Sequence, residues 1–253
     1  MSTLTAVEAG VYLYGIIDAR DGLDVSNRGI DGGNVETVEA DGIAAVITRV
    51  NRQIIRPQRA NLAAHNNLLR SLVENQGVIP CAFGMVASSE EQLQDVLRTN
   101  RDKLMDLLTR LRGKVEMSLS VYWNTSNIFE FFVAGNQELR AMRDRVFRAG
   151  RAPSMDERME LGRSFESLLR QCRERHTQQV IDTLSPYCAE IRDIDPGQEQ
   201  MIMKLVCLVP SNQQSRFEEG VQEAARKFDD HYTFKYSGPW APFDFVDVTL
   251  DLS

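Results

Sequence analysis

The arrangement of apolar and polar positions along residues 1–112 predicts four strands and two helices. The strongest strand signal is the apolar, β-prone run from Val11 to Ile17, which is typical of a buried strand. The pair Asp41-Gly42 separates two alternating runs and favours a tight hairpin. Ser88 and Glu91 have the spacing of a helix-capping box. The expected strands cover residues 11–17, 34–40, 43–50 and 78–86, and the expected helices cover residues 57–76 and 88–112.

From Lys114 onward the pattern changes to an order of strand, helix, strand, strand, helix and strand. The long helical region is interrupted at residues 148–153 and restarts at a second capping box, from Ser154 to Glu157. Asp195-Pro-Gly197 favours a turn between the two central strands. The expected strands cover residues 114–123, 187–194, 200–209 and 231–236, and the expected helices cover residues 127–185 and 211–228.

This order of elements is that of the ferredoxin-like arrangement, βαββαβ. We therefore expect an α+β protein with two domains and an extended C-terminal tail. The N-terminal α+β domain would cover residues 1–112, the ferredoxin-like domain with its long helical region residues 113–238, and the tail residues 239–253. The interruption at residues 148–153 is an alternative boundary, but it separates two helical stretches rather than two complete sets of strands.

The C-terminal tail is rich in large apolar side chains. Because two prolines lack amide donors and Gly238 permits an unusual turn, Gly238-Pro-Trp-Ala-Pro242 is expected to interrupt regular structure. Burying one large apolar side chain contributes about 1.5–3 kcal/mol, so we expect the tail to fold back over the protein with Trp240 buried and bridging the two domains. Packing on the second domain only, or docking of an exposed tail onto a partner, are the alternatives. The expected docking residues are Gly238, Pro239, Trp240, Phe243 and Phe245.

The overall charge limits the classes of function. Acidic residues outnumber basic ones, 36 to 29, and the net charge of -7 argues against a generic nucleic-acid binder, which needs a positive field. No apolar run reaches the roughly 20 residues that span a bilayer, and residues 1–10 lack the basic start and apolar core of a secretory signal. The composition therefore predicts a cytoplasmic protein without nucleic-acid or membrane partners.

Recognisable catalytic, cofactor and metal motifs are missing from the sequence. It has no glycine-rich phosphate loop, no G-x-S-x-G and no H-E-x-x-H, and its four cysteines are spaced as free thiols of a reducing compartment would be. Cys172 and His176 would share a helix face, but zinc normally takes three or four protein ligands and no second pair is visible. His65 lies on an apolar helix face, which favours a hydrogen-bonded core histidine over a general base. We expect no catalytic, cofactor-binding or metal-binding residues.

Arginine supplies 24 of the 29 basic residues. Its planar guanidinium suits protein interfaces better than the lysine ammonium does. Ten arginines and six acidic residues fall between residues 140 and 175. This stretch is interpreted either as a solvated helix face with ion pairs, such as Arg170 with Glu166, or as a partner-binding surface. The candidate partner-binding residues are Arg140, Arg143, Arg148 and Arg151.

Three segments together resemble the gas vesicle protein F/L family (GvpF/GvpL). They are Tyr12-Leu-Tyr-Gly-Ile-Ile17, Val78-Ile-Pro-Cys-Ala-Phe-Gly-Met-Val86 and Tyr236-Ser-Gly-Pro-Trp-Ala-Pro-Phe-Asp-Phe-Val246. The second is similar to the family's I-P-x-x-F-G strand and the third to its G-P-W-x-P-Y-x-F ending, while His65 falls where the family has a similar histidine. Ala82 and Phe243 depart from the pattern, in place of a basic residue and a tyrosine. The resemblance covers nearly the whole chain.

The resemblance implies a cytoplasmic, non-enzymatic accessory protein of gas vesicles, which are hollow protein shells that provide buoyancy. It implies a role in shell assembly through contact with the small hydrophobic shell protein, or with other accessory proteins. It also implies a two-domain α+β structure with a ferredoxin-like second domain. The apolar run at residues 128–133, followed by the arginines, would suit a hydrophobic partner, although most of its aromatic side chains are expected to belong to the domain core.

Two other classes of function remain open. An enzyme or small-molecule binder would use His65 or His231 as a base and would need a concave pocket with convergent polar groups. An RNA-binding ferredoxin-like module would display stacking aromatic side chains beside basic residues. The strand at residues 231–236 has such aromatic side chains, but it lies in an acidic neighbourhood.

Overall fold

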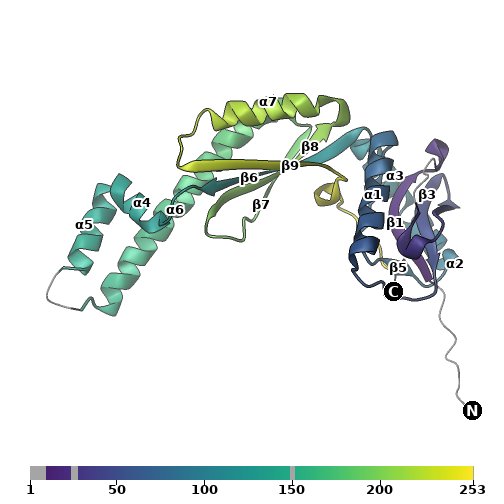
Figure 1. The fold of residues 1–253 in the computed structure, drawn as a ribbon, viewed down its shortest axis with the longest axis horizontal. Coiled ribbons are helices and arrows are strands. Elements are labelled where there is room, and N and C mark those ends of the chain that lie inside the picture. The colour runs from purple at the N-terminus through teal and green to yellow at the C-terminus, as the bar shows by residue number, and fades with distance from the viewer. Residues whose placement is uncertain (1–9, 24–27, 149–151, 253) are drawn as a thin grey trace, which may run out of the picture. The chain divides into compact units, whose positions relative to one another are not determined.

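The computed structural model describes residues 10–23, 28–148 and 152–252, which form two compact units (Figure 1). The first unit consists of the described residues of Met1–Met117, Leu208–Asn212 and Gly238–Ser253, and the second of those of Ser118–Cys207 and Gln213–Ser237. Helices and two separate sheets are present, so the expected α+β class is confirmed. Within these residues no helix combines the length and the apolar character needed to cross a membrane.

The first unit is built around β1 (Gly10–Asp18), every residue of which is buried. On one side β1 pairs with β3 (Ile43–Val50), which carries β2 (Glu36–Ala40) beyond it. The connection between β2 and β3 is the expected hairpin, because Asp41 and Gly42 have φ values of 49° and 87°. Two positive φ angles in succession are what the common two-residue hairpin turn requires.

The segment at residues 78–86 forms two short strands, β4 (Ile79–Pro80) and β5 (Val86–Ala87), so the expected continuous strand is wrong. Both pair with β1 on the side away from β3. Pro80 has no amide to donate to a ladder, which suits the end of an edge strand. Gly84 has a φ of 95° in the turn between the two strands, a conformation that favours glycine.

The described part of the first unit contains the helices α1 (Arg59–Asn75), α2 (Glu90–Thr99) and α3 (Arg101–Leu111). The single helix expected at residues 88–112 is therefore wrong. Asn100 separates α2 from α3, and its side-chain amide donates to the carbonyl of Val96 at 2.9 Å. This bond satisfies a terminal carbonyl of α2 and favours a stop at that residue. The apolar faces of both helices are still buried as the pattern predicted, through Leu93, Leu97, Leu104, Leu107, Leu108 and Leu111.

The second sheet has the strand order β7-β8-β6-β9, and its strands are β6 (Lys114–Trp123), β7 (Glu190–Ile194), β8 (Met201–Pro210) and β9 (Tyr232–Trp240). In chain order this places the first and third strands in the centre and the second and fourth at the edges, which is the ferredoxin-like arrangement. Helix α6 (Met155–Leu184) precedes β7 and α7 (Gln214–Ala225) precedes β9, and the two helices pack together (Figure 1). The expected ferredoxin-like order is confirmed.

The second unit also carries a helical extension, made of α4 (Ile128–Gly135), α5 (Gln137–Val146) and the first half of α6, which lies beyond the end of the sheet strands (Figure 1). Asn127 and Asn136 cap α4 and α5, and Ser154 with Glu157 forms the expected capping box of α6. The extension has a small core of its own, with Val133, Leu139, Val146 and Leu161 buried. It is therefore held together by local packing among three helices.

β9 continues through Gly238 and Pro239 to Trp240, so the expected interruption of regular structure at Gly238 is wrong. β9 is an edge strand, where a proline without an amide hydrogen breaks no ladder on the open side. Gly238 has a φ of 136°, and a Cβ there would lie 2.6 Å from Met117 Sδ and 2.8 Å from the carbonyl of Glu116. Only glycine fits this close approach. The described rest of the tail, residues 241–252, follows β9 and contains one short 3-10 turn, Phe243–Phe245.

Candidate functional site

Two of the segments that carry the family resemblance meet in the core of the first unit. The Tyr12 hydroxyl donates to His65 Nδ1 at 2.8 Å, and His65 Nε2 donates to the carbonyl of Cys81 at 3.1 Å. The amide of Gly84 donates to the Tyr12 oxygen at 3.3 Å, and the Phe83 ring contacts both Tyr12 and His65 edge-on. β1, α1 and the turn after β4 are thus joined through one buried histidine.

The electrostatics of this cluster favour a structural role. Burial lowers the pKa of His65 to about 4, so its imidazole is neutral near pH 7. Burial also raises the pKa of Cys81 to about 12 and raises that of Tyr12, so both stay protonated. A general base works best with a pKa near the operating pH, and both imidazole nitrogens are already hydrogen-bonded. The prediction of a hydrogen-bonded core histidine is confirmed.

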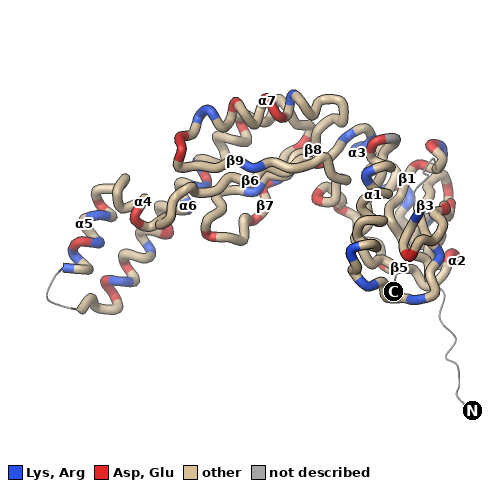
Figure 2. The backbone as a smooth tube through the Cα atoms, viewed as in Figure 1, with Lys and Arg blue, Asp and Glu red and all other residues tan. Residues whose placement is uncertain are grey.

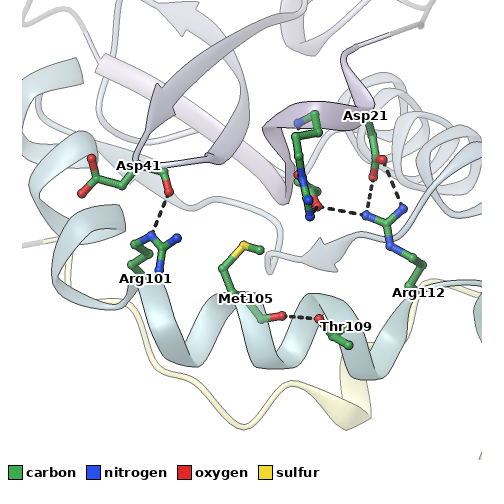
Figure 3. A network of polar contacts seen from close by, with 8 residues as sticks. Asp21, Asp41, Arg101, Met105, Thr109 and Arg112 are labelled. Carbon is green, nitrogen blue, oxygen red and sulfur yellow. Dashed lines mark hydrogen bonds and ion pairs between the residues drawn. The ribbon is translucent and has the colours of Figure 1, made fainter.

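A second polar network in the first unit joins the end of β1 to the end of α3 (Figure 3). The Arg112 guanidinium donates to the carboxylates of Asp18 at 3.1 Å and Asp21 at 2.8 Å, and Arg20 also pairs with Asp18 at 2.6 Å. Hydrogen bonds from Arg20 and the nearby charge of Arg112 lower the pKa of the buried Asp18 to about 2. These groups line a cavity of about 350 Å³. Because their charges are paired with one another, the network fixes the chain rather than presenting a reactive group.

The other two histidines lie in the second unit. His176 Nε2 lies 3.1 Å from the Tyr232 hydroxyl, and burial lowers its pKa. His231 is exposed, and its Nδ1 lies 3.0 Å from a carboxylate oxygen of Asp229. Among the described residues, no group of three or more His, Cys, Asp or Glu side chains has a geometry that could hold a metal ion. Tyr232 and Phe234 on β9 pack against Phe228 rather than standing free for base stacking.

The structure places the four candidate arginines differently from one another. Arg140 donates to the carbonyls of Val133 and Ala134, at the end of α4. Arg143 pairs with Glu130 at 3.1 Å and Asp144 at 2.8 Å, and both ion pairs raise its pKa. Arg148 is exposed just after α5. Arg151 lies outside the described residues. Arg140 and Arg143 therefore help to join α4 to α5. Arg148 has an exposed position, which favours a role at the surface.

Exposed apolar side chains at the end of the helical extension were missed by the sequence analysis. Phe147 is 60% exposed, Met155 76% and Met159 42%. The expectation that most aromatic side chains of residues 128–133 belong to a core is confirmed, because Phe129 and Phe132 pack against Phe165. The available signal was the spacing of Met155 and Met159, which a helix places on one face. Figure 2 shows that basic and acidic residues are interspersed along α5 and α6.

The tail is anchored on the first unit by Phe245, which is fully buried. Arg110 donates to the carbonyl of Phe245 and pairs with Asp247 at 2.8 Å. The amide of Asp244 donates to the carboxylate of Glu116 at 2.9 Å. The predicted fold-back of the tail therefore depends on Phe245 and on these polar contacts.

Trp240 is 45% exposed, so the prediction of a buried Trp240 is wrong, and with it the reason for a bridge between domains. Trp240 is the last residue of an edge strand, which has a neighbouring strand on one side only. Of the other expected docking residues, Phe243 is also exposed, while Pro239 is half-buried and Gly238 makes the close backbone approach to Met117. The sequence of the tail alone does not indicate which of its aromatic side chains is buried in the first unit.

This chain is similar to known gas vesicle proteins. The sequence profile described as "Gas vesicle synthesis protein GvpL/GvpF" matches residues 10–247. Gas vesicle protein F of a Nostoc species is 27% identical over 96% of this chain and 100% of its own length. Gas vesicle protein F1 of Halobacterium salinarum is 24% identical over 95% of this chain and 94% of its own length.

Solved structures agree with the sequence relatives. The crystal structure of the gas vesicle protein GvpF from an Anabaena species superposes with a TM-score of 0.83 at 27% identity, covering 95% of this chain and 99% of that chain. The crystal structure of GvpF from Microcystis aeruginosa superposes with a TM-score of 0.78 at 24% identity, covering 93% and 98%. The family profile spans both units, and the fold agrees along nearly the whole chain. The chain therefore belongs to the gas vesicle synthesis protein GvpL/GvpF family and has a role in gas vesicles.

Proposed function

We propose that this protein is a non-enzymatic accessory protein that binds the hydrophobic shell protein of the gas vesicle while the shell is formed. The observation that carries the proposal is the group of exposed apolar side chains at the end of the helical extension, Phe147, Met155 and Met159. Other gas vesicle accessory proteins are further partners of the same class. The contact surface consists of this apolar group with the arginines beside it, among them Arg148.

The physical chemistry of the group supports such a contact. Exposed large apolar residues that lie together on a surface are typical of protein–protein interaction sites. Methionine side chains are flexible and adapt to irregular apolar partners, and arginine is enriched at interfaces. An apolar subunit that must be kept from aggregating before assembly needs a partner with these properties. Arg140 and Arg143 contribute through exposed contacts that join α5 to α4.

The absence of catalysis is supported by the state of the candidate reactive groups. His65 is buried, neutral and hydrogen-bonded at both nitrogens. The charged groups around Asp18 are paired with one another. Cys81 is buried with a pKa raised to about 12, so it is not a thiolate nucleophile at neutral pH.

A binding experiment with a charge-matched control tests the proposal. The variant Arg143→Glu, Arg148→Glu and Arg151→Glu should fail to retain co-expressed shell protein in a pull-down. Its melting temperature should stay within a few degrees of the wild type, because exposed ion pairs contribute about 0–1 kcal/mol each. The control is the variant with glutamate at the exposed positions Arg56, Arg59 and Arg70 of the first unit, which should retain the shell protein.

Three outcomes contradict the proposal. One is wild-type protein that never retains shell protein although both are expressed. The second is a triple variant that binds as the wild type does. The third is equal loss of binding in both triple variants, since that result would reflect total charge rather than the helical extension.

A further inference from the structure

An apolar cavity of about 260 Å³ lies in the first unit between the tail and the body of the unit. Ile79, Cys81 and Leu104 line it from β4 and α3, and Val246, Val248 and Leu250 line it from the tail. Nearly all of the lining side chains are apolar and none is charged, with Thr249 as the polar exception, so the cavity offers no charged group that would orient a charged ligand. Its chemistry fits a hydrocarbon group.

The size of the cavity sets the size of the group that fits. An engineered apolar cavity of about 150 Å³ stays dry and binds benzene. A cavity of about 260 Å³ therefore has room for one large aromatic or branched side chain. Filling it would gain dispersion contacts that the lining atoms lack while the space is empty.

The tail gives the cavity one wall in which half-buried and exposed positions alternate. After the buried Phe245, residues 246–252 adopt no regular secondary structure. Val246, Val248 and Leu250 are half-buried and line the cavity, whereas Asp247 and Asp251 are exposed. A pocket lined by side chains at alternate positions is of the kind that selects one side chain of an extended peptide.

The exposed face of this wall is acidic. Asp244, Asp247 and Asp251 are all exposed, and Asp247 forms an ion pair with Arg110. A segment that lies along the tail would place its neighbouring residues near these carboxylates. Basic residues on either side of the inserted side chain would complement that charge, and acidic ones would be repelled.

We propose that this cavity receives one large apolar side chain from an extended segment of a protein partner, and that basic residues flank that side chain. The tail forms the second wall of the site. The proposal concerns the first unit only and does not rest on the contact of the helical extension proposed above, so either can fail without the other.

The test uses the full-length protein and short peptides, followed by the methyl NMR signals of Val246, Val248 and Leu250. The probe is a capped five-residue peptide with a central Phe between two Thr and with a Lys at each end. It should shift these methyl signals in a saturable way, and the shifts should weaken at high salt. The same peptide with Ala in the centre should bind at least about tenfold more weakly, because it lacks a large side chain to bury. A peptide with Glu at both ends should also bind more weakly.

Two variants locate the binding. Ala82 is exposed and lines the cavity, so Ala82→Phe should occupy the entrance and abolish the shifts. Ala63 is an exposed residue of α1, and Ala63→Phe is the matched control that should bind as the wild type does. If Ala82→Phe fails to fold, the Ala-centred peptide still decides the matter with wild-type protein.

The proposal is overturned if the Phe and Ala peptides give the same shifts, or if Ala82→Phe binds normally. Shifts of the same methyl signals that grow with protein concentration in the absence of peptide would also overturn it, because a second copy of this chain would then be the occupant. Lack of any response to the Lys-flanked Phe peptide at saturating solubility contradicts it directly.

Discussion

The buried pair Tyr12 and His65, which belongs to the family resemblance, and the residues of the helical extension proposed to bind a partner have opposite environments. Tyr12 and His65 are buried in the first unit, hydrogen-bonded to each other and packed on Phe83. Phe147 and Met155 at the end of the helical extension are among the most exposed large apolar side chains of the described residues. One region is a closed network, and the other carries exposed apolar side chains.

The difference teaches what the recognisable motif does. Removing one member of a buried polar network is costly, because its former partner remains buried as a donor or acceptor without a hydrogen bond. The pattern around Tyr12, Cys81 and Gly84 therefore identifies the fold of the first unit. The proposed contact surface needs only apolar area and charge, which many sequences can supply. The network around Tyr12 and His65 thus carries part of the family resemblance without marking the contact surface proposed on the helical extension.

The largest effect is expected from the anchor of the tail. Phe245→Ala should destabilise the first unit by about 3–5 kcal/mol in urea denaturation, because a fully buried phenylalanine leaves a cavity. Phe243→Ala is the matched control, and it should cost less than about 1 kcal/mol because Phe243 is 40% exposed. Equal losses of unfolding free energy in the two variants would contradict the prediction that burial decides how much each tail residue contributes to stability.

The next prediction concerns pH and the buried histidine. Since folding lowers the pKa of His65 from 6.5 to about 4, the folded protein binds fewer protons than the unfolded chain between these values. The contribution of the buried, neutral His65 to the free energy of unfolding is complete above pH 6.5. It is lost as the pH falls toward 4, and the total loss is at most about 3 kcal/mol. His65→Gln should lower stability at pH 7 and should flatten this part of the pH profile. Urea denaturation at several pH values measures both effects.

Parallel stability curves for the wild type and His65→Gln between pH 6.5 and 4 would contradict the prediction.

Asp18 titrates in a different pH range and serves as a check on the His65 prediction. Its pKa is lowered from 3.8 to about 2 by Arg20 and Arg112, so its contribution is present above pH 3.8 and is lost as the pH falls from 3.8 to about 2. The His65 effect should therefore be visible before Asp18 titrates.

Much of the fold could be predicted from local sequence patterns. The hairpin at Asp41-Gly42, the capping box at Ser154 and the ferredoxin-like strand order each follow from signals within a few residues or from the order of elements. The core position of His65 follows from the apolar face of its helix. Such features need no knowledge of the tertiary neighbours.

The errors arise where tertiary position decides. Pro239 is compatible with a strand only because β9 is at a sheet edge, and Trp240 is exposed for the same reason. For the candidate surface, the arginines could be predicted as a group, but their separate roles could not. Arg140 turns to the carbonyls of α4 and Arg143 to Glu130, which depends on how two helices meet. The exposure of Phe147 is equally a result of packing.

The smallest effect on stability should accompany a large effect on binding. Phe147→Ser with Met155→Ser should change the free energy of unfolding by no more than about 0.5 kcal/mol, because both side chains are largely exposed. Retention of shell protein should nevertheless be lost. The matched control is Ile54→Ser with Leu62→Ser, which removes two exposed apolar side chains from the first unit and should leave binding intact.

The same pair of variants distinguishes a specific surface from general stickiness. If apolar exposure alone retained the shell protein, both double variants would lose binding to a similar degree, since Ile54 is as exposed as Met155. Loss confined to the Phe147 and Met155 variant, without loss of stability, means that the position of these side chains on the helical extension matters. That outcome would show that the binding surface of this protein is distinct from the buried network around Tyr12 and His65, which carries part of the family resemblance.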